Sequence, residues 1–382
     1  MKNKVLKIMI SLGVILLFVG LSVIMVNAQF IKLETPPFTD QFKGSETPNM
    51  LIFLSPQYTS NNEIISAING YTQAVKEDVG WNAKIIRITE EQNDYEIIDE
   101  IIEDYYHKYT IKACLMVGED IDTPLAGDSD YMEKPSIVPW STIGGKESYT
   151  LTQQGIISKP YKMDICISLL YPTHDLDFLS KKSQIINVFE KFTNQRNSKY
   201  IQDITVFESS DININSKEIY QNIETNAKLN YIENPNNNSL EQSLTQNHSI
   251  FLIHGHSNPS GTYINGNEKI WFSAENLDEI KTPFFGADGC YVSGWWSNQK
   301  DNNRLDTSIC ATWYGSKIFT SKHINAMALG LLSQNGYTYN VSFIENAMPK
   351  LTEGNTLAES MIGSYFTGDF IIVGDPTFHF NV

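Results

Sequence analysis

Short apolar runs alternate along this chain with segments whose apolar side chains recur every three or four positions. A short apolar run predicts a buried strand, and the second pattern predicts an amphipathic helix. In the first half of the chain, the runs that predict strands are Met50–Leu54, Ala83–Ile88, Ile111–Val117 and Asp164–Leu170. Strands that alternate with helices favour an α/β fold with a mainly parallel sheet and helices on its faces.

Three segments near these runs have the spacing of helices. Their apolar positions are Ile64, Ile68, Tyr71 and Val75, then Ile97, Ile98, Ile101, Ile102 and Tyr105, then Ile185, Ile186, Phe189 and Phe192. We expect the first helix to begin with a capping box between Ser60 and Glu63, and to end at Gly80. Residues 118–160 lack such a period and are expected to be mainly loops.

The alternation starts again at Ile201–Phe207, so the sequence predicts one α/β half at residues 49–199 and a second at residues 200–382. The further strands expected in the second half are Ser249–His254, Pro283–Cys290, Lys317–Ser321 and Phe370–Val373. The helices expected there are Ile324–Leu332, Val341–Met348 and Thr356–Tyr365.

The first 28 residues have the pattern of a targeting segment. Lysines at positions 2, 4 and 7 precede the uncharged apolar stretch Ile8–Val26, and Val26-Asn27-Ala28 places small residues where a signal peptidase cleaves. This favours a cleaved secretory signal, with a membrane anchor as the alternative because the stretch is long. Residues 29–48 are expected to be a linker or a short pro-segment. The rest of the chain is then exported, and it contacts a membrane only through an uncleaved N-terminal segment.

Composition narrows the class of protein. The 382 residues are 41% hydrophobic and carry a net charge of −16, which supports a sizeable core and argues against nucleic-acid binding. Cys114 and Cys166 lie inside strand-like runs and are expected to be buried free thiols, while Cys310 lies in a helix-like context. The four cysteines include no C-x-x-C spacing, so no zinc site is predicted.

Two of the predicted strands end in residues that suit nucleophilic catalysis. The run Ser249–Gly255 ends in His254-Gly255, and the run Pro283–Cys290 ends in a cysteine 36 positions after that histidine. One crossover between neighbouring parallel strands fits this separation, and parallel sheets place their sites at the carboxyl ends of strands. Cys290 is therefore the candidate nucleophile and His254 the candidate base and acid.

The residues around the pair leave one alternative open. The backbone N–H groups of Gly255 and Cys290 are the candidate oxyanion donors. His256 follows Gly255 and is the alternative base, although His254 directly ends the apolar run and is preferred. Cys310 is a weaker candidate for the nucleophile.

At these residues the chain resembles the gingipain family of cysteine peptidases, within the wider group that includes caspases and legumains. That group pairs an apolar block ending in His-Gly with a second block ending in Cys. Further likeness lies in Met116–Asp120, Gly127–Tyr131, Met163–Leu170, Leu357–Glu359 and Val373–Pro376, so the resemblance covers about residues 50–380.

The resemblance implies two packed α/β subdomains with mainly parallel sheets, the second caspase-like, and peptide-bond hydrolysis through a thioester. Carried over, Cys290 matches the nucleophile, and His254 with Gly255 matches the His-Gly pair. The chain departs from the family's frequent Gly-His-Gly-Ser pattern, because here Ile253 precedes the histidine and His256 follows the glycine. If Gly255-His256 is aligned with the Gly-His of the family pattern instead, His256 takes the place of the base. His256 therefore remains the alternative to His254.

The resemblance also suggests residues that bind the substrate. Lys159 lies near the place where arginine-specific members carry an Asp, and it would favour an acidic substrate residue. Asp288 would instead favour a basic one, and Trp295 and Trp296 are candidates for a pocket wall. Asp128 or Asp130 is a candidate partner of the histidine, with a role in a turn as the alternative. Some relatives use calcium, and Asn298–Asp306 is a candidate calcium-binding stretch, although it lacks the regular D-x-D-x-D-G spacing.

The sequence therefore predicts an exported cysteine endopeptidase that acts on a peptide or protein substrate. One alternative is an inactive binding or scaffold protein that keeps the fold. The other is a transpeptidase, in which an amine takes the place of water in the second half of the reaction.

Overall fold

A computed structural model describes most of the chain after residue 46. The described residues are 47–126, 134–152, 155–158, 160–172, 176–194, 196, 201, 203–211, 216–222, 227–232, 234–258, 261–266, 268–273, 276, 279–290, 325–331, 343–366 and 371–381. Asp288–Cys290 and Asn325–Leu331 are among the residues described by their backbone alone. The predicted targeting segment and nearly all of the predicted linker lie outside the described residues. Within the described part, no helix is long and apolar enough to cross a membrane.

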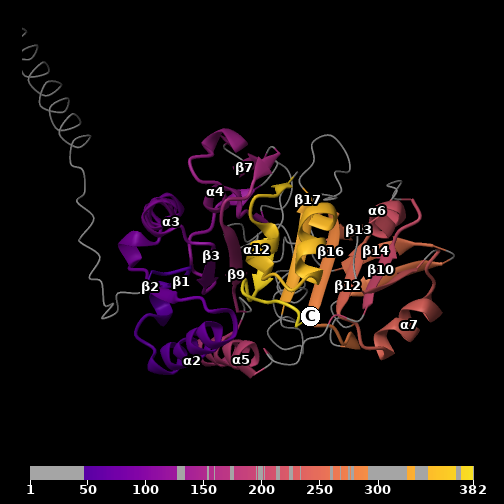
Figure 1. The fold of residues 1–382 in the computed structure, drawn as a ribbon, viewed down its shortest axis with the longest axis horizontal. Helices are drawn as coiled ribbons and strands as arrows, with labels where there is room; N and C mark the ends of the chain where they lie inside the picture. Colours follow the sequence, from indigo (N-terminus) through magenta and orange to yellow (C-terminus); the bar gives the residue numbers. More distant parts are fainter. Residues whose placement is uncertain are drawn as a thin grey trace, which may run out of the picture. The chain divides into compact units, whose positions relative to one another are not determined.

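The N-terminal half contributes four parallel strands to the central sheet, as the sequence predicts. In spatial order they are β9 (Cys166–Leu170), β3 (Ala113–Val117), β1 (Met50–Leu54) and β2 (Ala83–Arg87). Helices α2 (Asn62–Val79) and α5 (Phe178–Asn194) lie side by side on one face, and α3 (Tyr95–Tyr109) covers the other (Figure 1). Most of the apolar positions that predicted these helices are buried, while Ile97 and Ile186 are partly buried.

The start of α2 differs from the predicted capping box. Asn61 is the N-cap, and its side-chain oxygen accepts hydrogen bonds from the backbone N–H groups of Glu63 and Ile64. Ser60 is therefore not the cap, because Asn61 satisfies the orphan donors of the first turn from one position later. The predicted end is confirmed, since Gly80 adopts a left-handed φ of 73° at the C-cap.

The C-terminal half continues the same sheet. Its strands in spatial order are β11 (Lys228–Ile232), β10 (Asp203–Glu208), β12 (Ile250–His254), β16 (Phe284–Cys290), β17 (Asn325–Leu331) and β19 (Ile371–Gly374). The first five are parallel to one another, and β19 is antiparallel to β17. Helix α6 (Ser216–Asn222) connects β10 to β11, and α7 (Asn237–Thr245) connects β11 to β12. The α/β class with mainly parallel strands is thus confirmed.

Strand β19 joins the two halves into one ten-stranded sheet. It is parallel to β9 at Val373 and Leu169 but antiparallel to β17. The strands of the two halves therefore run in opposite directions, and their carboxyl ends lie at opposite edges of the sheet. The predicted boundary at residues 199 and 200 falls outside the described residues and stays a prediction.

Two segments that connect strands of the large sheet contain more secondary structure than the sequence predicted. The stretch expected to be mainly loops contains a short helix, α4 (Val138–Ser141), and a four-stranded sheet of β4 (Leu125–Ala126), β5 (Lys134–Pro135), β6 (Tyr149–Thr152) and β7 (Gly155–Ser158). The connection from β12 to β16 contains a three-stranded antiparallel sheet of β13 (His256–Asn258), β14 (Gly261–Asn265) and β15 (Lys269–Ser273).

The helix predicted at Ile324–Leu332 is wrong, because residues 325–331 form strand β17 between β16 and β19. A short apolar run does not distinguish a buried strand from a buried helix. The predicted strand Lys317–Ser321 lies outside the described residues. The remaining elements are η6 (Phe343–Ala347), α11 (Met348–Thr352), α12 (Leu357–Met361), the strand pair β8 (Tyr161–Lys162) and β18 (Tyr365–Phe366), and the short helices η1 (Pro56–Tyr58), η2 (Glu90–Gln92) and η3 (Lys146–Ser148).

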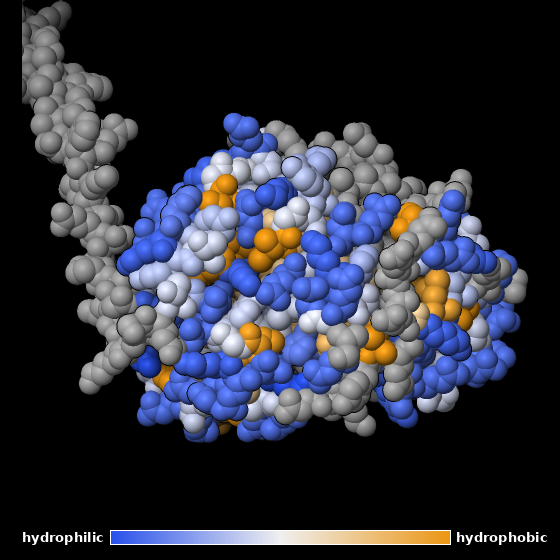
Figure 2. Space-filling model, viewed as in Figure 1, coloured by the Kyte–Doolittle hydropathy of each residue, from blue (hydrophilic) through white to orange (hydrophobic). Residues whose placement is uncertain are grey.

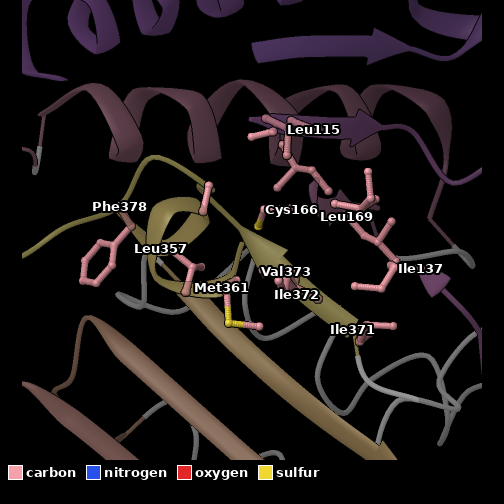
Figure 3. Close-up of a cluster of buried hydrophobic side chains, with 14 of the residues drawn as sticks. Leu115, Ile137, Cys166, Leu169, Leu357, Met361, Ile371, Ile372, Val373 and Phe378 are labelled. Atoms are coloured by element: carbon pink, nitrogen blue, oxygen red, sulfur yellow. The ribbon is translucent and has the colours of Figure 1, made fainter. Parts of the chain in front are cut away.

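Buried side chains from both halves meet around β19 and α12. Figure 3 shows Leu115 of β3 and Cys166 and Leu169 of β9 near residues of β19 and α12. Cys114 and Cys166 are buried free cysteines, as predicted. On the face seen in Figure 2, apolar surface occurs only in small separate patches among polar side chains.

Asp99 of α3 is a buried acid that makes stability depend on pH. Among the described residues, its Oδ1 atom has no hydrogen-bond partner. Burial, and then repulsion from Glu103, raises the pKa of Asp99 to about 7, although Lys146 opposes the shift. The pKa of Asp99 is higher in the folded protein than in the unfolded chain, so folding favours the protonated carboxyl. The free energy of unfolding is therefore higher at low pH, and this stability is lost as pH rises through 7.

We expect Asp99→Asn to raise the free energy of unfolding at pH 8.5, by on the order of 2–3 kcal/mol after allowance for solvent screening, and to change it little at pH 4.5. Urea unfolding at the two pH values measures the difference. Asp104→Asn, at an exposed position of the same helix, is the matched control. An equal effect of Asp99→Asn at both pH values would contradict the assignment.

Candidate active site

His254 is the last residue of β12 and is almost completely buried, with 1% of its surface exposed. Its Cα pairs in register with Glu208 of β10 on one side and with Asp288 of β16 on the other. The backbone carbonyl of His254 accepts a hydrogen bond of 2.9 Å from the N–H of Ser209. The strand therefore holds this histidine at the carboxyl edge of the C-terminal half.

Cys290 is the last residue of β16, two positions beyond the register partner of His254. Strands β12 and β16 are adjacent and parallel, as the 36-residue separation predicted. Because alternate positions of a strand share one face, backbone position 290 belongs to the same face of the sheet as position 288. Asp288 and Gly289 share this end of β16, and for all three residues the structure describes the backbone alone.

Tyr220 of α6 contacts the candidate base and was not anticipated from the sequence. Its Oη atom lies 2.7 Å from Nε2 of His254, and both side chains are buried. The ring of Tyr220 also lies 6.4 Å from that of Tyr231 on β11. No motif signals this contact, because Tyr220 lies 34 positions before His254 in a short helix without a clear apolar period.

Gly255 follows His254 at the turn into β13, and the structure gives a packing reason for a glycine. A Cβ atom there would lie 2.3 Å from the backbone oxygen of Tyr263 and 2.7 Å from a methyl carbon of Thr262. The backbone of β14 thus approaches Gly255 closely. The glycine is needed for this approach whether or not a substrate carbonyl also comes near.

His256, the alternative base, has a different environment. It begins β13, is about one third exposed, and its Nε2 lies 3.2 Å from Oδ2 of Asp211. Slight burial raises the pKa of Asp211, but hydrogen bonds from Ser209 and Asn265 and the charge of His256 outweigh it, so this pKa is lowered overall. His256 is therefore held by a surface carboxylate and belongs to the antiparallel sheet rather than to the end of β12.

That antiparallel sheet displays a row of exposed side chains beside the histidines. His256 pairs in register with Tyr263 of β14, which in turn pairs with Trp271 of β15. The rings of Tyr263 and Trp271 lie 4.4 Å apart, and both residues are more than a third exposed. The predicted pocket walls Trp295 and Trp296 lie outside the described residues.

The remaining predicted site residues also lie outside the described part of the chain: Lys159, Asp128, Asp130, Cys310 and the stretch Asn298–Asp306. Lys159 is flanked by β7 and β8, and β8 pairs with β18 just before β19. The Gly-acid turn Gly118–Asp120 follows β3, so it lies at the edge of the sheet opposite to His254.

Of the comparisons with known proteins, the one with solved structures bears on the fold. No family model and no curated protein sequence matches this chain. A solved structure described as a protease is 11% identical, with a TM-score of 0.53, over 88% of this chain and 79% of that one. The crystal structure of the Arg-specific cysteine proteinase gingipain R is 11% identical over the same shares, with a TM-score of 0.47.

A third solved structure is the complex of the pro- and mature domains of RgpB from Porphyromonas gingivalis. It is 12% identical, with a TM-score of 0.48, over 87% of this chain and 80% of that one. Over 88% of its length, this chain therefore has the α/β fold of a solved protease.

Proposed function

We propose that this protein is an exported cysteine endopeptidase with Cys290 as nucleophile and His254 as general base and acid. One observation carries the proposal: β12 and β16 are adjacent parallel strands whose register pairs His254 with Asp288, two residues before Cys290. The two residue types that nucleophilic catalysis needs thus come from neighbouring strand ends at one edge of the sheet. The fold shared with a solved protease supports the reaction class.

In the first half-reaction, His254 takes the proton of the Cys290 thiol, and the sulfur forms a bond to the carbonyl carbon of the substrate. The N–H groups of Gly255 and Cys290 are the proposed donors to the resulting oxyanion. The C–N bond then breaks as His254 returns the proton to the leaving amine, which leaves a thioester. In the second half-reaction, His254 takes a proton from water, whose oxygen attacks the thioester and releases the acid and the thiol.

The environment of the two histidines supports His254 over His256. A buried imidazole at the strand end is shielded from bulk water, whereas His256 is partly exposed and paired with Asp211. Asp288, Lys159, Trp295 and Trp296 remain the proposed contacts to a peptide substrate. We also retain the proposal that residues 1–28 direct export, as a cleaved signal or as an anchor.

Labelling with iodoacetamide near neutral pH, read by peptide mass mapping of the purified protein, tests the proposal. We expect fast and selective modification of Cys290, because a neighbouring imidazole raises the thiolate fraction of a cysteine. Cys114 and Cys166 are internal controls, since burial raises the pKa of both thiols. Labelling of Cys290 no faster than that of Cys310 would contradict the proposal and favour an inactive binding protein.

A further inference from the structure

The contact between Tyr220 and His254 defines the roles of the two imidazole nitrogens. Nε2 lies 2.7 Å from the tyrosine oxygen, which is a hydrogen-bond distance, and the two rings lie 6.0 Å apart at 44°. Tyr220 is 3% exposed and His254 is 1% exposed, so bulk water does not compete for this bond. Because Nε2 lies against Tyr220, a proton from the thiol would be taken by Nδ1 of His254.

A neutral histidine carries one N–H, and the hydrogen bond at one nitrogen sets which tautomer is present. If Tyr220 accepts a hydrogen bond from Nε2–H, the lone pair lies on Nδ1, and Nδ1 acts as a base. If Tyr220 donated to Nε2 instead, Nδ1 would carry the proton and His254 would not take one from the thiol. Catalysis through this histidine therefore requires the tyrosine oxygen to be the acceptor.

We propose that Tyr220 is a positioning residue that holds His254 in the Nε2–H tautomer and orients Nδ1 toward Cys290. This inference rests on the proposed Cys290–His254 pair and adds the member that orients the base. The same oxygen holds Nε2–H after Nδ1 has taken the thiol proton, so it stabilises the imidazolium that forms. The role is the one that a carboxylate has in a Ser-His-Asp triad, but here the partner is neutral.

The charged groups near the histidine are consistent with a neutral partner. Glu208 is the register neighbour of His254 on β10, and Asp288 is the neighbour on β16. The carboxylate of Asp211, beyond the end of β10, forms hydrogen bonds with His256, Ser209 and Asn265. The oxygen of Tyr220 lies at hydrogen-bond distance from Nε2 of His254. The phenol is thus placed to fix the tautomer of His254.

The variant Tyr220→Phe tests the inference, because it removes one oxygen atom and keeps the buried ring. We expect the alkylation rate of Cys290 to fall by about 10- to 100-fold, with kcat lowered to a similar extent and KM unchanged. We also expect the ¹⁵N NMR signals of the His254 ring to move from the Nε2–H tautomer toward Nδ1–H. Tyr231→Phe, which removes the hydroxyl of the neighbouring ring, is the matched control and should leave the tautomer unchanged.

The possible results separate this inference from the function on which it rests. Fast labelling of Cys290 in both the unsubstituted protein and Tyr220→Phe, with one tautomer of His254 in both, would overturn the role of Tyr220 and leave the proposed peptidase intact. Slow labelling of Cys290 in the unsubstituted protein would overturn the Cys290–His254 pair itself. A thermal unfolding midpoint of Tyr220→Phe close to that of Tyr231→Phe shows that a lost rate comes from the site and not from unfolding.

Discussion

Replacing Cys290 with Ala should reduce peptide hydrolysis by at least about 10³-fold while leaving the protein folded. The reason is that no other group supplies the sulfur that forms the thioester, although binding and the oxyanion donors persist. A mixture of fluorogenic peptides measures the rate, and the thermal unfolding midpoint measures folding. His254→Ala should cause a loss of similar size, because nucleophile and base act as a unit and their effects do not add.

Two matched variants make this result specific. His256→Ala removes an imidazole two positions from His254 and should lower the rate by less than about 10-fold, because its partner is a surface carboxylate. Cys310→Ala tests the weaker nucleophile candidate and should leave the rate unchanged. If His256→Ala is inactive and His254→Ala is active, the base is assigned two residues too early.

Mass analysis of the products with an added amine separates hydrolysis from transpeptidation.

The second large effect concerns stability. Arg196 lies after α5 and is almost fully buried, with one guanidinium nitrogen 2.8 Å from Asp78 of α2 and the other 2.7 Å from Asp375 after β19. Tyr71 of α2 donates a hydrogen bond of 2.6 Å to Asp375, and Thr377 lies 2.6 Å from the guanidinium. This network ties the helices of the N-terminal half to the chain that leaves β19, the strand joining both halves.

We expect Arg196→Met to lower the free energy of unfolding by about 3–5 kcal/mol, because Asp375 would remain buried without its cation. Urea unfolding at neutral pH measures the change. The double variant Arg196→Met with Asp375→Asn should recover part of the loss, since it removes the uncompensated charge.

Lys182→Met is the matched control for this network. Lys182 of α5 pairs with Glu63, whose side chain is 70% exposed, so its loss should cost less than about 1 kcal/mol. An effect of Arg196→Met no larger than that of Lys182→Met would show that the buried network contributes little.

Most strands of the large sheet could be predicted because they are apolar runs bounded by polar segments, whereas β11 was not predicted. Met50–Leu54 and Ile250–His254 are completely or almost completely buried, and such strands have a signal that needs no tertiary information. Residues 325–331 show where this signal fails, because an apolar run of similar length was assigned to a helix and forms β17. The pairing partners of a strand decide its state, and the sequence does not state them.

The small sheets were missed for a related reason. Some of their strands, such as Leu125–Ala126 and His256–Asn258, have two or three residues, too few for an alternating pattern to appear. They form because neighbouring backbone groups, once brought together by the large sheet, need hydrogen-bond partners. Their existence therefore follows from the fold and not from local preference.

The sequence by itself indicated the α/β class, most strands of the large sheet and the two residues proposed for catalysis, because burial and strand ends leave local patterns. Only the tertiary structure decided that β19 joins ten strands into one sheet, that the two halves run in opposite directions, and that Tyr220 meets His254. Each of these features depends on contacts between residues far apart in the chain. Such contacts produce no local pattern of apolar and polar residues, so they cannot be predicted from the sequence in this way.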